Sequence, residues 1–162
     1  TVLDNASLGL ETQGMLKKEA RDRVLSEIEA FGLSGYEHMY PYSLSGGMRQ
    51  RVAFLRTMVM DQPIVLLDEP FGALDSLTRV QMQRWLLEIW KLMDKTIVLV
   101  THDVDEALFL SDIIYLLSDR PGSNASTMKV GIQRPRKHDM LNSPEFIEMK
   151  QDLLSRLWSY ID

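Results

Sequence analysis

The sequence of 162 residues contains no cysteine, so disulfide bonds and thiol chemistry are excluded. No apolar run approaches the roughly 20 residues that cross a bilayer, so any association with a membrane is expected to be peripheral. Basic residues are also outnumbered by acidic ones, with 18 Lys and Arg against 23 Asp and Glu. The formal net charge of −5 argues against nucleic acid as the main partner, because phosphate-backbone binding needs clustered Lys and Arg.

A phosphate-binding loop of the form G-x-x-x-x-G-K-S/T is also missing from the sequence. The nearest stretch, residues 122–129, lacks the second glycine and does not join a predicted strand to a predicted helix. The chain opens on Thr1 without an initiator Met and without the pattern of a signal peptide. We therefore expect it to be a segment of a longer protein.

Hydrophobic periodicity predicts an α-helical region followed by alternating strands and helices, which is an α/β fold with a parallel sheet. Apolar runs at 64–67 and 97–100 predict strands buried on both faces. We divide the chain into a helical part (1–43), a core (44–122) and a final strand and helix (123–162). Helices are expected over 2–11, 17–31, 46–60, 76–93, 103–110 and 144–161, further strands over 112–117 and 128–133, and a turn at 120–122.

The third predicted helix begins at a serine followed by two glycines. Ser45 is a good N-cap, and Gly46 and Gly47 leave the first backbone N–H groups uncovered by side chains. Uncovered amides at the positive end of a helix dipole form an anion site, so the pattern is compatible with a phosphate. The pentapeptide alone is more typical of a plain turn than of a phosphate site.

Acidic residues and a histidine follow the two apolar strands. Asp68 and Glu69 end the first strand, and His102 follows the second, which places all three at one edge of a parallel sheet. Asp68 could orient Mg²⁺ through water, Glu69 could activate a water molecule, and His102 could bind a phosphate. The Asp-Glu pair alone and the histidine alone are more typical of structural roles, and Asp75 alone is typical of a helix cap.

Taken in order, four motifs resemble one family closely. LSGGM at 44–48, IVLLDEP at 64–70, ALD at 73–75 and THD at 101–103 are similar to the signature, Walker B strand, D-loop and switch histidine of ATP-binding cassette (ABC) transporter ATPases. FGALD at 71–75, VDEA at 104–107, RPG at 120–122 and RPR at 134–136 resemble the nitrate, sulfonate and taurine importers of bacteria.

The resemblance implies an ATPase subunit that couples hydrolysis to solute import at the cytoplasmic face of the bacterial inner membrane. It implies a P-loop NTPase-like fold, incomplete here because the phosphate-loop half is missing. Its cofactors would be ATP and Mg²⁺, and its partners an integral membrane permease, which would dock on the helical part, and a second ATPase copy packed head to tail.

The family's functional residues carry over to matching positions in this sequence. Glu69 and His102 would be catalytic, and Asp68 would hold the metal. The nucleotide of the second copy would be contacted by Ser45, Gly46, Gly47, Met48 and Asp75. Met48 replaces the commoner glutamine, which should matter little because the contacts come mainly from the serine and the backbone.

Two other readings stay open from the residues. The first is a soluble ABC-type ATPase of DNA repair or translation, which the acidic charge and the lack of a coiled-coil insertion disfavour. The second is a docking or dimerisation module without catalysis, which the missing phosphate loop favours for the segment by itself.

Overall fold

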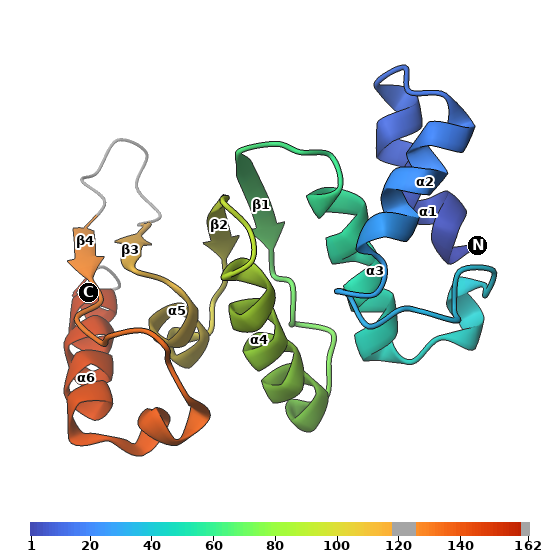
Figure 1. Ribbon diagram of the computed structural model, residues 1–162. Helices are drawn as coiled ribbons and strands as arrows, with labels where there is room; N and C mark the ends of the chain where they lie inside the picture. The colour runs from blue at the N-terminus through green and yellow to red at the C-terminus, as the bar shows by residue number, and fades with distance from the viewer. Residues whose placement is uncertain (118–125, 160–162) are drawn as a thin grey trace. The chain divides into compact units, whose positions relative to one another are not determined.

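The computed structural model describes residues 1–117 and 126–159 (Figure 1). The chain divides into two compact units, Thr1–Val98 and Leu99–Asp162. The three-part division at 43 and 122 remains a prediction. The turn predicted at 120–122 lies outside the described residues.

The first unit begins with two helices that pack against each other and, through α1, against α3 (Figure 1). Helix α1 (Val2–Thr12) starts at Thr1, whose hydroxyl accepts a hydrogen bond from the N–H of Asp4. Helix α2 (Lys17–Glu27) ends earlier than the predicted residue 31, because a series of turns leads into Gly32 at φ +65°. The apolar face predicted for this region is buried; it consists of Val24, Ile28 and Phe31.

The carboxylate of Asp4 in α1 forms an ion pair with α2. It pairs with Arg21 of α2 and accepts a 2.7 Å hydrogen bond from the Thr1 hydroxyl. These hydrogen bonds, that from Arg21 foremost, hold the pKa of Asp4 well below its usual range. The folded state thus binds the Asp4 proton less readily than the unfolded state.

We predict that this contact makes stability sensitive to acid. Because the folded-state pKa of Asp4 is depressed, its contribution is present above the ordinary pKa and disappears as the pH falls through the lower value. Between about pH 4 and pH 2, the melting temperature of the wild type should fall more than that of Asp4→Asn. Asp22→Asn, which removes an exposed carboxylate from α2, is the control and should follow the wild type.

The core of the first unit forms where α3 (Gly46–Met58) meets α4 (Ser76–Trp90). A short 3₁₀ helix, η1 (Pro41–Ser43), leads into α3. The ring of Phe54 lies between those of Phe71 and Trp85, with centroid distances of 6.1 and 5.5 Å. Phe31 packs edge-on against Trp85, and the guanidinium of Arg51 lies over the Trp85 ring, 5.2 Å from its centroid.

Strands β1 (Ile64–Asp68) and β2 (Thr96–Val100) form a two-stranded sheet, and the boundary between the units falls inside β2. The prediction that both strands are buried on both faces is wrong for the described residues. In β1, Val65 and Leu67 are buried, whereas Ile64 and Leu66 are 57% and 72% exposed. The described chain covers only one face of β1, so alternate side chains point to solvent.

The second unit contains α5 (Val104–Leu110), β3 (Ile113–Leu116), β4 (Ser126–Lys129), η2 (His138–Asn142) and α6 (Pro144–Trp158). Strands β3 and β4 are antiparallel, with Ile113 opposite Lys129. The strand predicted at 128–133 is observed at Ser126–Lys129. It ends at Lys129 because that residue pairs with Ile113, the first residue of β3. Phe109, Phe146 and Leu153 form buried parts of this unit.

Candidate functional site

The signature segment forms the start of α3, as predicted. The Ser45 hydroxyl accepts a 3.2 Å hydrogen bond from the N–H of Met48, and Ser45 is exposed. Arg49 donates a 2.5 Å hydrogen bond to the carbonyl of Leu44, which closes the turn before the helix. The serine, the glycines and Met48 thus lie together at one helix terminus, where the dipole favours an anion.

The two glycines also allow close packing between α3 and the segment that begins α4. A Cβ added to Gly47 would lie 3.1 Å from the Thr78 methyl carbon, and one added to Gly46 would lie 3.5 Å from Leu74. The missing side chain of Gly47 therefore serves the contact with α4 as well as the exposure of backbone amides. The sequence pattern by itself predicts only the exposure of the amides.

This contact places the starts of two helices next to each other. Asp75 is the N-cap of α4, and its carboxylate accepts a 2.9 Å hydrogen bond from the N–H of Thr78. Hydrogen bonds from the hydroxyl and the N–H of Thr78 lower the pKa of Asp75, so its carboxylate is charged at neutral pH. The structure thus brings Asp75 and the signature glycines together within one unit.

We predict unequal effects from enlarging the two glycines. Gly47→Val should lower the free energy of unfolding by about 1–3 kcal/mol, because a branched side chain would press against Thr78, itself branched at Cβ. Gly46→Ala should change it by less than about 1 kcal/mol, since its Cβ meets Leu74 at an ordinary contact distance. Urea unfolding of both variants tests the contact, and equal losses would contradict it.

Asp68 and Glu69 stand at the carboxyl end of β1, as predicted, and both are exposed. Glu69 has φ +45°, a left-handed conformation that side chains other than glycine rarely adopt. The N–H of Gly72 donates a 3.2 Å hydrogen bond to the Glu69 carbonyl, and a Cβ on Gly72 would lie 3.7 Å from the Glu69 carboxylate. Strained backbone of this kind is concentrated at functional sites.

His102 belongs to the second unit, where it directly precedes Asp103, the N-cap of α5. Its neighbour Asp103 caps that helix by accepting a 3.1 Å hydrogen bond from the N–H of Glu106. The hydroxyl of Thr101 accepts from the N–H of Asp103 at 3.1 Å. That His102 shares a sheet edge with Asp68 and Glu69 remains a prediction.

Within residues 1–117 and 126–159, no three His, Asp or Glu side chains are grouped so that they could hold a metal alone. Mg²⁺ in proteins keeps several waters and uses one or two carboxylates together with phosphate oxygens. The exposed carboxylate of Asp68 is a suitable ligand for such an ion. In the same residues, no helix is long and apolar enough to cross a membrane.

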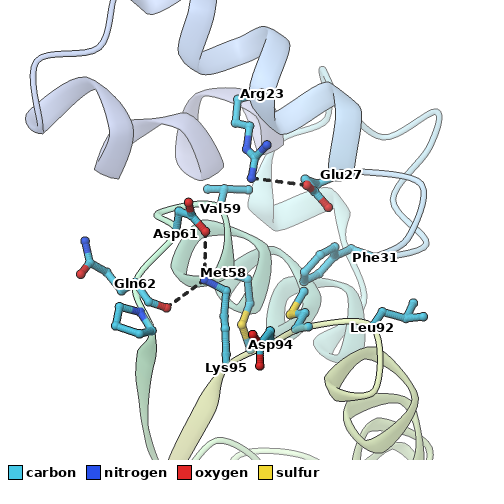
Figure 2. Close-up of a pocket in the computed structure, with 12 residues that line it drawn as sticks. Arg23, Glu27, Phe31, Met58, Val59, Asp61, Gln62, Leu92, Asp94 and Lys95 are labelled. Atoms are coloured by element: carbon cyan, nitrogen blue, oxygen red, sulfur yellow. Dashed lines mark hydrogen bonds and ion pairs between the residues drawn. The ribbon is translucent and has the colours of Figure 1, made fainter.

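A pocket of about 350 Å³ lies elsewhere on the first unit (Figure 2). It lies between the ends of α2 and α3 and the residues preceding β1 and β2. Lys95 donates a 2.8 Å hydrogen bond to the Gln62 carbonyl, and Arg23 pairs with Glu27 at 3.7 Å. None of the predicted site residues lines it, and no sequence motif marked it in advance.

Comparison with known proteins identifies the family. The sequence pattern of the family described as "ABC transporter" matches residues 1–72. An ABC transporter ATP-binding protein of Methanocaldococcus jannaschii is 46% identical over 157 residues, which are 97% of this chain and 58% of that protein. This chain belongs to the ABC transporter family.

Other ABC proteins extend the comparison. The taurine import ATP-binding protein TauB of Yersinia pestis is 41% identical over 162 residues, with 97% of this chain and 64% of that protein covered. The solved structure of cbiO1 from Clostridium perfringens, part of the ABC transporter complex cbiONQ, covers 97% of this chain and 59% of its own, with 25% identity and a TM-score of 0.64. The predicted fold class, an incomplete P-loop NTPase-like α/β fold, is confirmed. The chain spans 58 to 64% of the length of these curated ABC relatives.

Proposed function

We propose that this chain is part of the ATP-binding subunit of an importer of the nitrate, sulfonate and taurine group, which couples ATP hydrolysis to solute import. The observation that carries the proposal is the contact between the starts of α3 and α4, where Gly47 meets Thr78 and the N-caps Ser45 and Asp75 stand exposed. The names of the relatives, among them taurine and formylaminopyrimidine import ATP-binding proteins, support the importer group.

In the proposed reaction, this chain faces a nucleotide held by a second copy packed head to tail. The Ser45 hydroxyl and the amides of Gly46 and Gly47 would donate to the terminal phosphate, and Met48 would hold the serine in place through its N–H. Asp75 would connect the two facing sites. A helix start with exposed amides suits this task, because its dipole and its N–H groups both favour negative charge.

The remaining residues would act on the nucleotide bound by their own copy. Asp68 would hold Mg²⁺ through water, and the bound ion would neutralise phosphate charge. Glu69 would accept the proton of the attacking water, and His102 would donate to the terminal phosphate. The exposure of Asp68 and Glu69 at the end of β1 supports this assignment.

Docking on a permease would place the protein at the cytoplasmic face of the membrane, as a peripheral subunit. The helical part contributes Arg23, Glu27 and Phe31 to the pocket in Figure 2, which supports this pocket as the place where permease side chains insert. Because the chain lacks cysteine, Leu92→Cys, at a lining residue that is 77% exposed, would give the described segment a single thiol. It should cross-link to the permease, whereas Leu8→Cys on α1 should not.

The test of the proposed function is ATP turnover by the complete gene product that contains residues 1–162. We expect Mg²⁺-dependent hydrolysis that rises when the permease is present. We also expect residues 1–162 alone to bind a fluorescent ATP analogue more weakly than the complete product. A complete gene product that neither binds nor hydrolyses ATP would overturn the proposal and favour a docking module without catalysis.

A further inference from the structure

Two arginines of the second unit bind the end of the short helix that follows His102. Helix α5 ends at Leu110, so the carbonyls of its last three residues, 108–110, and that of its C-cap Ser111 have no partner within the helix. Arg136 Nη1 donates to the carbonyls of Leu108 and Phe109, each at 3.3 Å, and to that of Ser111 at 2.6 Å. Arg134 Nη2 donates to the remaining carbonyl, Leu110, at 2.6 Å. The two side chains therefore contact every free carbonyl of the helix end, and because Nη1 of Arg136 carries two hydrogens, one of its N–H groups is shared between two carbonyls.

The guanidinium of Arg136 is held firmly. Its side chain is 1% exposed, its Nε donates to the Ile132 carbonyl at 3.0 Å, and its Nη2 lies 3.4 Å from the carboxylate of Asp112. Arg134 pairs with the same carboxylate at 2.9 Å. A planar group with five donors can make these contacts at once, which a lysine cannot.

Both ends of α5 are therefore fixed. At the N-terminal end the carboxylate of Asp103 caps the helix, and along its length Asp105 pairs with Lys150 of α6 at 2.7 Å. A helix of this length has little stability of its own, and its position therefore depends on such contacts. A seven-residue helix extends about 10 Å, and His102 directly precedes its cap.

We propose that Arg136, assisted by Arg134, is a positioning residue that sets the place of His102 by holding the carboxyl end of α5. The proposal rests on the proposed function, because it matters for the reaction only if His102 contacts the nucleotide. Arg136 itself touches backbone carbonyls and Asp112, so it acts through the helix and not on the phosphate.

Turnover by the complete gene product tests the role in the reaction. Arg136→Met should lower kcat by about 10- to 100-fold, the range for a small displacement of a catalytic group, and change KM for MgATP by less than about two-fold. Arg136→Lys should recover part of kcat, because an ammonium group can still bind one or two of the carbonyls. Arg156→Met, the same substitution in an arginine that pairs with Asp152 on α6, should leave both constants unchanged.

A signal from His102 tests its position independently of activity. In the same protein labelled with [¹³C]histidine, and with the His102 resonance assigned by its loss in His102→Gln, Arg136→Met should shift or broaden that resonance. The His38 resonance, from the first unit, should stay in place, and Arg156→Met should move neither. If Arg136→Met does not fold, Arg134→Met removes only the Leu110 and Asp112 contacts and should give the same changes, smaller in size.

An unchanged His102 resonance, or equal losses of kcat in the Arg136 and Arg156 variants, would overturn the proposal. A wild type without ATP turnover would instead overturn the proposed function. In that case, a His102 resonance that moves only in the Arg136 and Arg134 variants would still support the positioning role.

Discussion

Replacement of Glu69 by Gln in the complete gene product is expected to lower ATP turnover by about 10²–10⁴-fold, the usual effect of losing a positioned general base. The amide keeps the size of the side chain but cannot accept a proton from water. Binding of the nucleotide should persist, because Glu69 is assigned to proton transfer and not to phosphate contacts. Phosphate release and the anisotropy of a fluorescent ATP analogue measure the two properties separately.

The control for this experiment is Glu88→Gln, which makes the same change at an exposed position of α4. Its turnover should equal that of the wild type. If Glu69→Gln keeps more than half of the activity, Glu69 is not the general base. A loss of nucleotide binding in parallel with turnover would point to a role for Glu69 in holding the nucleotide.

The second large effect is expected in the aromatic core of the first unit. Phe54 is 2% exposed and lies between Phe71 and Trp85, so Phe54→Ala leaves a cavity between two rings. The free energy of unfolding should fall by about 3–5 kcal/mol. Small domains are stable by only about 5–15 kcal/mol, so much of the population would unfold under mild conditions.

Urea unfolding of residues 1–162 measures this loss. Tyr42→Ala is the control, because this aromatic residue is 81% exposed and its main contact is a stack on Tyr40. Its effect should stay below about 1 kcal/mol. A loss of similar size in Phe54→Ala would show that the core does not depend on the Phe54 ring.

Local patterns predicted the elements that carry the site. A serine before two glycines and a run of helix formers predicted the start of α3, and Ser45 caps that helix. An apolar run followed by two acids predicted β1 and the exposed ends Asp68 and Glu69. These features were accessible because capping and strand formation depend on residues a few positions apart.

Contacts between distant parts of the sequence could not be predicted in the same way. Gly47 packs on Thr78, which is 31 residues further along the chain, and no periodicity links the two. The Arg-Pro-Arg segment at 134–136 indicated only a family resemblance. In the structure, Arg136 donates to the carbonyl of Leu108, 28 residues earlier in the chain, and no local pattern predicts this contact. The left-handed backbone conformation of Glu69 could not be predicted from the sequence either, because it depends on the turn between β1 and α4.

Buried and exposed side chains alternate along β1, so substitutions in this strand can change stability and solubility separately. Val65 and Leu67 face the packed interior, so substitutions there act on the stability of the fold. Ile64 and Leu66 lie on the open face, where a threonine or a lysine would leave that packing untouched and make the surface more polar. Within residues 1–162, adjacent positions of β1 thus offer independent control of stability and of solubility.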